Sequence, residues 1–166
     1  MSAPLIHIDE LQFARELKHG DRFEAKLAPV APRIGARKLG YNVTVVPPGK
    51  RAFPFHNHHA NEEMFFVLEG EGVLRFGAEE FAVRKGHFIA CPAGGPDVAH
   101  QLLNTGTTGL RYIAVSTTID TDIWEYPDSG KFGCMGGRQP GRPLSEATFA
   151  AKFVPESAEV DYYHGE

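Results

Sequence analysis

The sequence predicts an all-β fold, a sandwich or a barrel built from short strands. Turn residues recur along the middle of the chain, among them Pro47, Pro48 and Gly49 and, later, Gly94 and Gly95. Between the turns lie runs rich in β-branched and aromatic residues, the types that strands prefer; they cover residues 41–46, 63–68, 72–76, 80–84, 87–90 and 110–115. Short strands at a spacing of about 8–12 residues, separated by glycine and proline turns, are typical of these two architectures.

Length and composition limit the classes of protein to which the chain can belong. Its 166 residues suit one domain, and 42% hydrophobic and 23% charged residues are ordinary for a soluble globular protein. The net charge is −4 and lysines and arginines form no cluster, so the electrostatic signature of a nucleic-acid binder is missing. Apolar runs are far too short to cross a bilayer. The expected partner is therefore a small-molecule substrate, with no nucleic acid and no membrane.

The N-terminal residues and the two cysteines predict where in the cell the protein is located. Residues 1–10 contain neither a basic start nor an apolar stretch long enough for a secretory signal, which predicts a cytoplasmic protein. Cys91 and Cys134 form no CxxC pair, so we expect two reduced thiols. Cys91 directly precedes Pro92 and is expected to be buried as a small apolar residue.

The strand pattern divides a single domain into three parts. Residues 37–118 are expected to form the β-barrel core, residues 1–36 an N-terminal arm, and residues 119–166 a C-terminal arm packing on the barrel. Both arms are expected to be short and irregular or helical. Leu11, Ala14 and Leu17 fall near helical spacing and predict one short helix near residues 9–19.

One stretch carries residues suited to metal binding. His56 and His58 point the same way if this segment is a strand, and Glu63 opens the next one. His100 follows the glycine-rich loop. An isolated histidine is more often an ordinary core or surface residue, and Glu63 alone could be a solvated charge. Together, three imidazoles and one carboxylate would form a site for one divalent transition metal, Mn, Fe, Ni, Co or Zn rather than Mg or Ca.

The order and spacing of these residues resemble the two motifs of the cupin superfamily. The first motif is matched by Gly49, His56, His58, Glu63 and Gly70, and the second by Gly86, Pro92, Gly94, His100 and Asn104. The loop between Gly94 and His100 holds five residues where the family usually has two. The resemblance covers roughly residues 40–117. It implies a double-stranded β-helix, a jelly-roll-like barrel, with a metal held by His56, His58, Glu63 and His100.

Within that superfamily the chain looks like small single-domain bacterial cupins that are provisionally called sugar-phosphate isomerases. This finer resemblance rests on the residues around Asn61, Glu62 and Glu63 and on the segment 125–131. It implies a metal-dependent enzyme acting on a small polar substrate. Two alternatives stay open, an iron-dependent dioxygenase and a non-catalytic small-ligand-binding cupin. Catalytic residues stay unassigned, with Glu62 and Glu69 as accessible candidates for a general base.

Several other side chains have two interpretations. Arg75 and Arg111 either bind a substrate anion or, more simply, belong to a solvated strand face. Trp124 and Tyr126 either cover the pocket or pack in a dimer interface. We expect a homodimer, with residues 1–36 and the region of Trp124 as contact surfaces. The loop 94–99 is expected to form part of the rim of the site, and the expected core includes Phe65, Val67, Phe81 and Val83.

Overall fold

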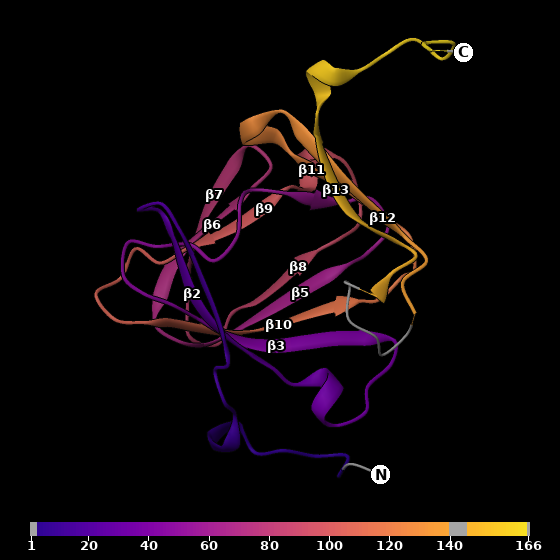
Figure 1. Ribbon diagram of the computed structural model, residues 1–166. Helices are drawn as coiled ribbons and strands as arrows, with labels where there is room; N and C mark the ends of the chain where they lie inside the picture. Colours follow the sequence, from indigo (N-terminus) through magenta and orange to yellow (C-terminus); the bar gives the residue numbers. More distant parts are fainter. Residues whose placement is uncertain (1–2, 140–145, 166) are drawn as a thin grey trace.

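The computed structural model describes residues 3–139 and 146–165 and shows an all-β protein. Its largest sheet has the strand order β1-β2-β3-β10-β5-β8, with every pair antiparallel. Figure 1 shows β3, β10, β5 and β8 side by side in the lower half of the molecule. The strands of this sheet are β1 (Arg15–His19), β2 (Phe23–Pro29), β3 (Leu39–Val46), β5 (Glu63–Glu69), β8 (Phe88–Cys91) and β10 (Leu110–Thr117).

Two smaller antiparallel sheets complete the described fold. The three-stranded sheet has the order β7-β6-β9 and consists of β6 (Glu71–Phe76), β7 (Glu79–Arg84) and β9 (His100–Leu103). The four-stranded sheet has the order β13-β12-β11-β4 and consists of β4 (Asn57–His58), β11 (Asp122–Tyr126), β12 (Lys131–Gly136) and β13 (Phe149–Pro155). Short 3-10 turns join the strands: η1 (Ile8–Glu10), η2 (Ala31–Arg33), η3 (Pro96–Val98), η4 (Pro127–Ser129) and η6 (Glu156–Ala158).

The core lies between the sheets and follows from strand alternation. On β10, Leu110, Tyr112 and Ala114 are buried while their neighbours are half-exposed. Such alternation places every second side chain away from water, where apolar burial stabilises the fold by about 25 cal/mol per Å². The core cluster is formed by residues of the six-stranded and three-stranded sheets, among them the expected Phe65, Val67 and Val83.

Phe81 is not in the core, contrary to expectation. Its side chain is 45% exposed, whereas Val83, two residues further along β7, is 5% exposed. β7 is an edge strand of the three-stranded sheet and pairs with β6 alone. Its side chains are therefore covered from one side only, and Phe81, near the turn that joins the two strands, stays in contact with solvent.

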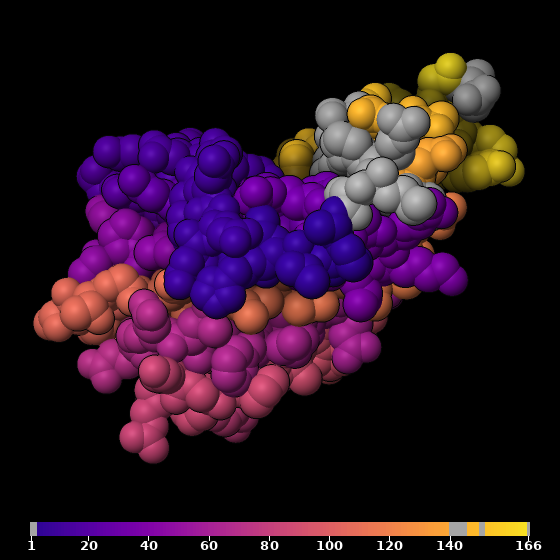
Figure 2. Space-filling model, turned by 90° about the horizontal axis from the view of Figure 1, so that it is seen from below, coloured from indigo at the N-terminus to yellow at the C-terminus, as the bar shows by residue number. Residues whose placement is uncertain are grey.

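The helix expected near residues 9–19 is wrong. Residues 8–10 form the 3-10 turn η1, and residues 15–19 form β1, which pairs with β2 in a hairpin. Leu17 lies opposite Ala25 and packs against the core, so sheet pairing outweighs a weak helical spacing. Residues 1–36 thus supply two strands of the largest sheet, and Figure 2 shows the N-terminal residues, in indigo, spread over the face seen from below.

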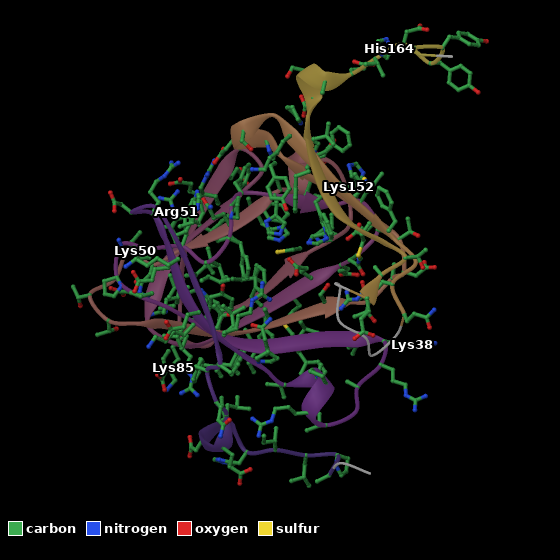
Figure 3. The ribbon with its side chains drawn as sticks, in the orientation of Figure 1. Lys38, Lys50, Arg51, Lys85, Lys152 and His164 are labelled. Carbon is green, nitrogen blue, oxygen red and sulfur yellow. The ribbon has the colours of Figure 1, made fainter. Side chains whose placement is uncertain are left out.

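Basic side chains are distributed around the outside of the molecule. Figure 3 shows Lys38, Lys85 and Lys152 on separate parts of its periphery, and His164 on the C-terminal segment that extends away from the sheets. This distribution agrees with the absence of a cationic stripe in the sequence. Within residues 3–139 and 146–165, no helix is both long and apolar enough to span a bilayer.

Candidate metal centre

The four residues singled out by the motifs come from different sheets and meet inside the barrel. His58 lies on β4, Glu63 begins β5 and His100 begins β9. His56 precedes β4 and forms an isolated bridge with His100, in which each backbone N–H donates to the other residue's carbonyl oxygen, at 3.2 and 2.8 Å. Backbone pairing between His56 and His100 therefore fixes the positions from which these two side chains extend.

The side-chain donor atoms converge on the Glu63 carboxylate. The ligand atoms of His56, His58 and Glu63 lie within 4.8 Å of one another. Glu63 Oε2 is 3.1 Å from Nε2 of His100, 3.6 Å from Nε2 of His58 and 3.9 Å from Nε2 of His56. His56, His58 and Glu63 thus form one group of ligand atoms, and His100, 2% exposed, joins this group through its contact with Glu63.

The opposite nitrogen of each imidazole is held by an oxygen. Nδ1 of His56 lies 2.9 Å from the carbonyl oxygen of Pro54, and Nδ1 of His100 lies 3.2 Å from that of Val98. Nδ1 of His58 lies 2.6 Å from a carboxylate oxygen of Asp122. Oxygen acceptors of this kind favour the tautomer with the proton on Nδ1, which leaves the Nε2 lone pair of each ring free for a metal.

The charges of the cluster suit a divalent cation. Burial outweighs the attraction of Glu63 and lowers the pKa of His56 to about 4. Burial alone would raise the pKa of Glu63, but the close contacts of its carboxylate with His100, His58 and His56 outweigh burial and bring the pKa below its usual value. His56 is thus neutral and Glu63 ionised at neutral pH, and nitrogen and carboxylate donors together fit a transition metal.

Asp122 is a functional residue that the sequence reasoning missed. It lies at the start of β11, is 1% exposed, and accepts hydrogen bonds from the Asn61 side chain and from the backbone of Ala60 and Ile123. Burial raises its pKa, but the hydrogen bonds from His58 and Asn61 dominate and lower the pKa to about 2. The acidic composition of residues 120–125 was visible in the sequence, but the contact with His58 was not.

Aromatic side chains of the four-stranded sheet cover the histidines. The Trp124 ring meets His58 edge-on at 6.1 Å, and the Tyr126 ring stacks on His56 at 5.9 Å. Phe153 of β13 packs against both, at 6.1 and 5.8 Å. Trp124 is only 8% exposed within a single chain. Of its two interpretations, the structure therefore supports a cover over the site, while the dimer interface stays a prediction.

Arg75, Arg111 and Glu69, which the sequence named as candidate site residues, pair with side chains other than the four candidate ligands. Arg75 forms a two-pronged hydrogen bond with Asp128, at 2.8 and 2.9 Å, and stacks over Phe55. Arg111 and Glu69 lie 3.8 Å apart. Glu69 ends β5, six residues from Glu63, or about 20 Å along a strand that rises about 3.3 Å per residue. Glu69 is therefore excluded as a base for chemistry at Glu63.

Glu62, the other candidate base, is exposed just before β5. Its backbone N–H donates to the Thr117 hydroxyl at 3.0 Å. Because successive side chains of an extended chain alternate between faces, Glu62 and Glu63 project to opposite sides. Its placement thus offers no support for a role at the metal centre.

The loop 94–99 joins the site from the side of His100. The Gly94 N–H donates to the carbonyl oxygen of His58 at 2.8 Å, and the Asn57 side chain donates to the carbonyl oxygen of Gly94 at 2.8 Å. Val98, at the end of η3, supplies the oxygen beside His100. The enlarged loop therefore supports the histidines through its backbone.

Both cysteines are free, and Cys91 is 1% exposed on β8, opposite Glu63 on β5. Burial raises the pKa of its thiol. The expectation of two reduced thiols with Cys91 in the core is confirmed.

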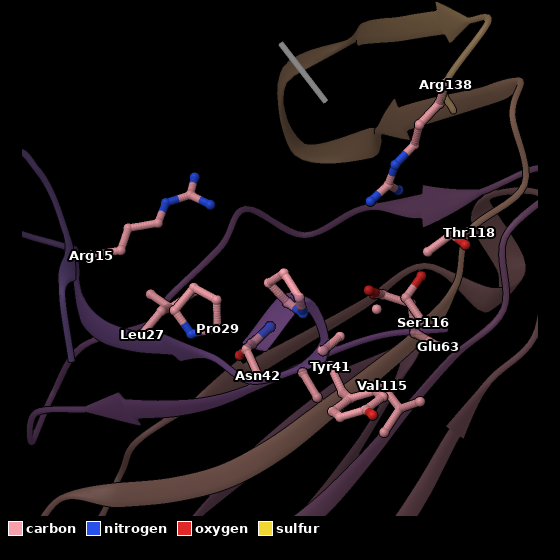
Figure 4. A pocket seen from close by; sticks show the side chains of 14 residues that line it. Arg15, Leu27, Pro29, Tyr41, Asn42, Glu63, Val115, Ser116, Thr118 and Arg138 are labelled. Atoms are coloured by element: carbon pink, nitrogen blue, oxygen red, sulfur yellow. The ribbon is translucent and has the colours of Figure 1, made fainter. Parts of the chain in front are cut away.

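A cavity of about 230 Å³ leads to Glu63 from the outside. Figure 4 shows its wall, with Ser116 and Thr118 on the side of Glu63 and Leu27, Pro29 and Asn42 on the opposite side. Glu63 is the member of the candidate cluster that lines this cavity, which lies between β3, β10 and the segment after β12.

Comparison with known proteins agrees with this geometry. The family described as "Cupin domain" matches residues 42–116. An uncharacterized protein of Methanocaldococcus jannaschii is 33% identical over 85 residues, which are 49% of this chain and 65% of that protein. The matches span less than two thirds of the length of the curated relatives.

Two crystal structures share nearly the whole fold. A protein of Acidithiobacillus ferrooxidans, provisionally named a sugar phosphate isomerase, has a TM-score of 0.77 at 22% identity, covering 95% of this chain and 96% of its own. A protein of Silicibacter pomeroyi, named a sugar phosphate isomerase from a cupin superfamily, has a TM-score of 0.76 at 20% identity, covering 93% and 94%. Identity at this level shows the fold alone. Residues 42–116 therefore match the cupin-domain family, and the chain has an all-β cupin fold that resembles the fold of proteins named as sugar phosphate isomerases.

Proposed function

We propose that this protein is a metal-dependent enzyme acting on a small polar substrate, with sugar-phosphate isomerisation as its reaction. The observation that carries the proposal is the convergence of three Nε2 atoms on Glu63 while each Nδ1 is held by an oxygen. Such a site is preformed for a metal, and the cavity at Glu63 gives it an opening. The shared fold of two proteins named as sugar phosphate isomerases supports the choice of substrate.

His56, His58, Glu63 and His100 would hold the ion. A divalent metal there supplies a Lewis acid that polarises a hydroxyl or carbonyl oxygen. Trp124 and Tyr126 cover the histidines and exclude water from that side. Burial and the charge of Glu63 raise the pKa of Tyr126 to about 12, so its hydroxyl keeps its proton at neutral pH and acts as a hydrogen-bond donor rather than a base.

Metal content is the first test of the proposal. We expect purified protein to hold close to one transition-metal ion per chain, and His58→Ala to lose at least nine tenths of it, because one of four donors is gone. His59→Ala is the matched control, since His59 is 42% exposed and pairs with Glu125 instead. Elemental analysis by mass spectrometry measures all three proteins. Full metal content in His58→Ala would contradict the proposed ligand set.

Activity then separates isomerisation from the two alternatives. Metal-loaded protein is incubated with aldose and ketose phosphates in deuterated water, and NMR follows interconversion and deuterium uptake beside the carbonyl carbon. A parallel oxygen-electrode assay follows O₂ consumption. We expect isomerisation without O₂ uptake. Metal-dependent O₂ uptake instead would favour the iron dioxygenase, for which the same donor set is suitable, and binding without turnover would favour the non-catalytic binder.

A homodimer and a cytoplasmic location stay predictions of the sequence. The edge strands β1 and β8 of the largest sheet offer backbone groups on which a second copy could pair. A small-molecule substrate is the partner that the cavity supports.

A further inference from the structure

Two arginines, Arg15 and Arg138, line the cavity that reaches Glu63. Arg15 begins β1 and Arg138 follows β12, so segments more than a hundred residues apart in the chain bring them to one opening. Figure 4 shows Arg15 on one side of the cavity and the Arg138 side chain reaching toward it from the other. The backbone N–H of Arg138 donates to the carbonyl oxygen of Asp120 at 3.0 Å, which fixes where that side chain starts.

The charges around the cavity favour an anionic ligand. Glu63 is the one acidic side chain among the described residues that line it. Within residues 3–139 and 146–165, no salt bridge joins Arg15 or Arg138 to a carboxylate. When Glu63 binds a metal, both guanidinium charges at the opening remain available to a ligand. Arg75 and Arg111 differ in this respect, because Asp128 and Glu69 already pair with them.

The size and wall of the cavity favour a small hydroxylated ligand. Its volume of about 230 Å³ lies below the roughly 300–1,000 Å³ of pockets that hold drug-sized molecules. Ser116 offers a polar group near Glu63, Asn42 offers another on the side of Leu27, and Leu27 forms part of an apolar wall. A ligand that reaches from the arginines to Glu63 therefore needs a charged group at one end and oxygen atoms along the rest.

We propose that Arg15 and Arg138 bind the phosphate group of a small phosphorylated polyol whose other end approaches Glu63. This inference rests on the proposed function and names two residues that would set its specificity. A phosphate monoester carries nearly two negative charges at neutral pH, which two guanidinium groups balance. Each guanidinium can donate two parallel hydrogen bonds to phosphate oxygens. A single carboxylate group carries one charge and is satisfied by one arginine, whereas oxalate, with two carboxylate groups, matches the charge of a phosphate monoester and is therefore the stricter comparison.

Matched ligands and matched variants test the assignment by calorimetry. Metal-loaded wild type, Arg15→Gln, Arg138→Gln and Arg84→Gln are titrated with ribose 5-phosphate, ribose and oxalate. Arg84 is the control because it is an exposed arginine on β7, in the three-stranded sheet. We expect ribose 5-phosphate to bind wild type and Arg84→Gln alike. Each cavity variant should bind it at least tenfold more weakly, since a hydrogen bond to a charged group contributes about 1.5–3 kcal/mol and 1.4 kcal/mol is tenfold.

A second titration separates this inference from the proposed function. Inorganic phosphate is added to protein freed of metal by a chelator, where only side chains and backbone can bind it. We expect the same order, with wild type and Arg84→Gln binding more tightly than the two cavity variants. This result would support the arginine site even if the metal-loaded protein proved to have no isomerase activity.

Three results would overturn the inference. One is equal affinity of ribose 5-phosphate for wild type and for both cavity variants. Another is tighter binding of oxalate than of ribose 5-phosphate with the same loss in the cavity variants, which would assign the arginines to a carboxylate. The third is the absence of measurable binding of both inorganic phosphate and ribose 5-phosphate. In the first case isomerase activity on a sugar phosphate would leave the proposed function intact.

Discussion

Asp122 links the C-terminal part of the chain to the metal centre through one side chain. Its Oδ2 atom lies 2.6 Å from Nδ1 of His58 and 2.7 Å from Nδ2 of Asn61, and its Oδ1 atom accepts from two backbone N–H groups. A carboxylate held this firmly can fix both the tautomer and the rotation of the imidazole that it touches. Asp122 is therefore a positioning residue for the proposed ligand His58.

Replacing this carboxylate should weaken metal binding without removing a ligand. We expect Asp122→Asn to lower metal affinity about 10–100-fold, because an amide is a poorer acceptor and can also present its NH₂ group to Nδ1 of His58. Competition with a chromogenic chelator measures the affinity.

The matched control is Asp120→Asn, two residues earlier and exposed. It should keep wild-type affinity. NMR of the His58 ring nitrogens shows which nitrogen carries the ring proton. A general loss of stability would not change the position of this proton. Unchanged affinity and an unchanged proton position in Asp122→Asn would contradict the positioning role.

At the scale of elements, the four-stranded sheet forms the cover of the site. Strand β11 carries Asp122, Trp124 and Tyr126, and strand β13 adds Phe153 behind the two aromatic rings. Gly133 of β12 lies opposite Trp124, and a Cβ atom there would come within 2.7–2.9 Å of the Phe153 and Trp124 rings. The close approach of these rings therefore depends on the absence of a side chain at Gly133.

A methyl group at this position should disturb the cover. We expect Gly133→Ala to lower the free energy of unfolding by about 1–3 kcal/mol, the usual effect of overpacking, and to shift the emission of Trp124, the one tryptophan of the chain. Urea unfolding and fluorescence measure the two effects.

Gly136→Ala is the control on the same strand. The nearest atoms to a Cβ at Gly136 are 3.8 and 3.9 Å away, which is ordinary contact. Both variants replace a glycine by alanine, so the effect on the unfolded chain is the same in each. The difference between their free energies of unfolding therefore reports the contact with the rings. An emission spectrum of Gly133→Ala identical to that of Gly136→Ala would contradict the packing that we describe.

At the scale of the whole molecule, the metal centre joins all three sheets. His58 belongs to the four-stranded sheet, Glu63 to the six-stranded sheet and His100 to the three-stranded sheet. An ion held by these residues would tie together chain segments from β4 to β9. Binding to the folded chain should therefore stabilise the molecule as a unit.

Removal of the metal should lower the thermal stability of the entire domain. At free metal of about 100 times Kd, binding contributes about 2.7 kcal/mol, which corresponds to a Tm difference of roughly 5–10 °C for a domain of this size. Differential scanning calorimetry with and without a chelator measures it. His58→Ala should show no difference and His59→Ala the full one. A wild-type Tm that the chelator leaves unchanged would contradict the stabilisation of the domain by the bound metal.

The sequence by itself determined the strands of the core and the four proposed ligands. His56 and His58 share a face because side chains alternate along an extended chain, and the spacing to Glu63 and His100 is a property of two local motifs. Alternation likewise placed Phe65 and Val67 in the core. The prediction of Phe65 and Val67 in the core was confirmed because alternation depends on residues close together in the chain. The ligand set stays a prediction, which the short distances between the four side chains support.

Only the tertiary structure decided what surrounds the site. The contact between His58 and Asp122 joins residues that are 64 positions apart in the chain. Arg15 and Arg138, which belong to distant parts of the chain, line the same cavity. Residues 15–19 became a strand because β2 offers backbone partners, whatever their own weak helical spacing. Contacts of this kind leave no periodic trace in the sequence, because the partner that satisfies each group is supplied by the folded chain.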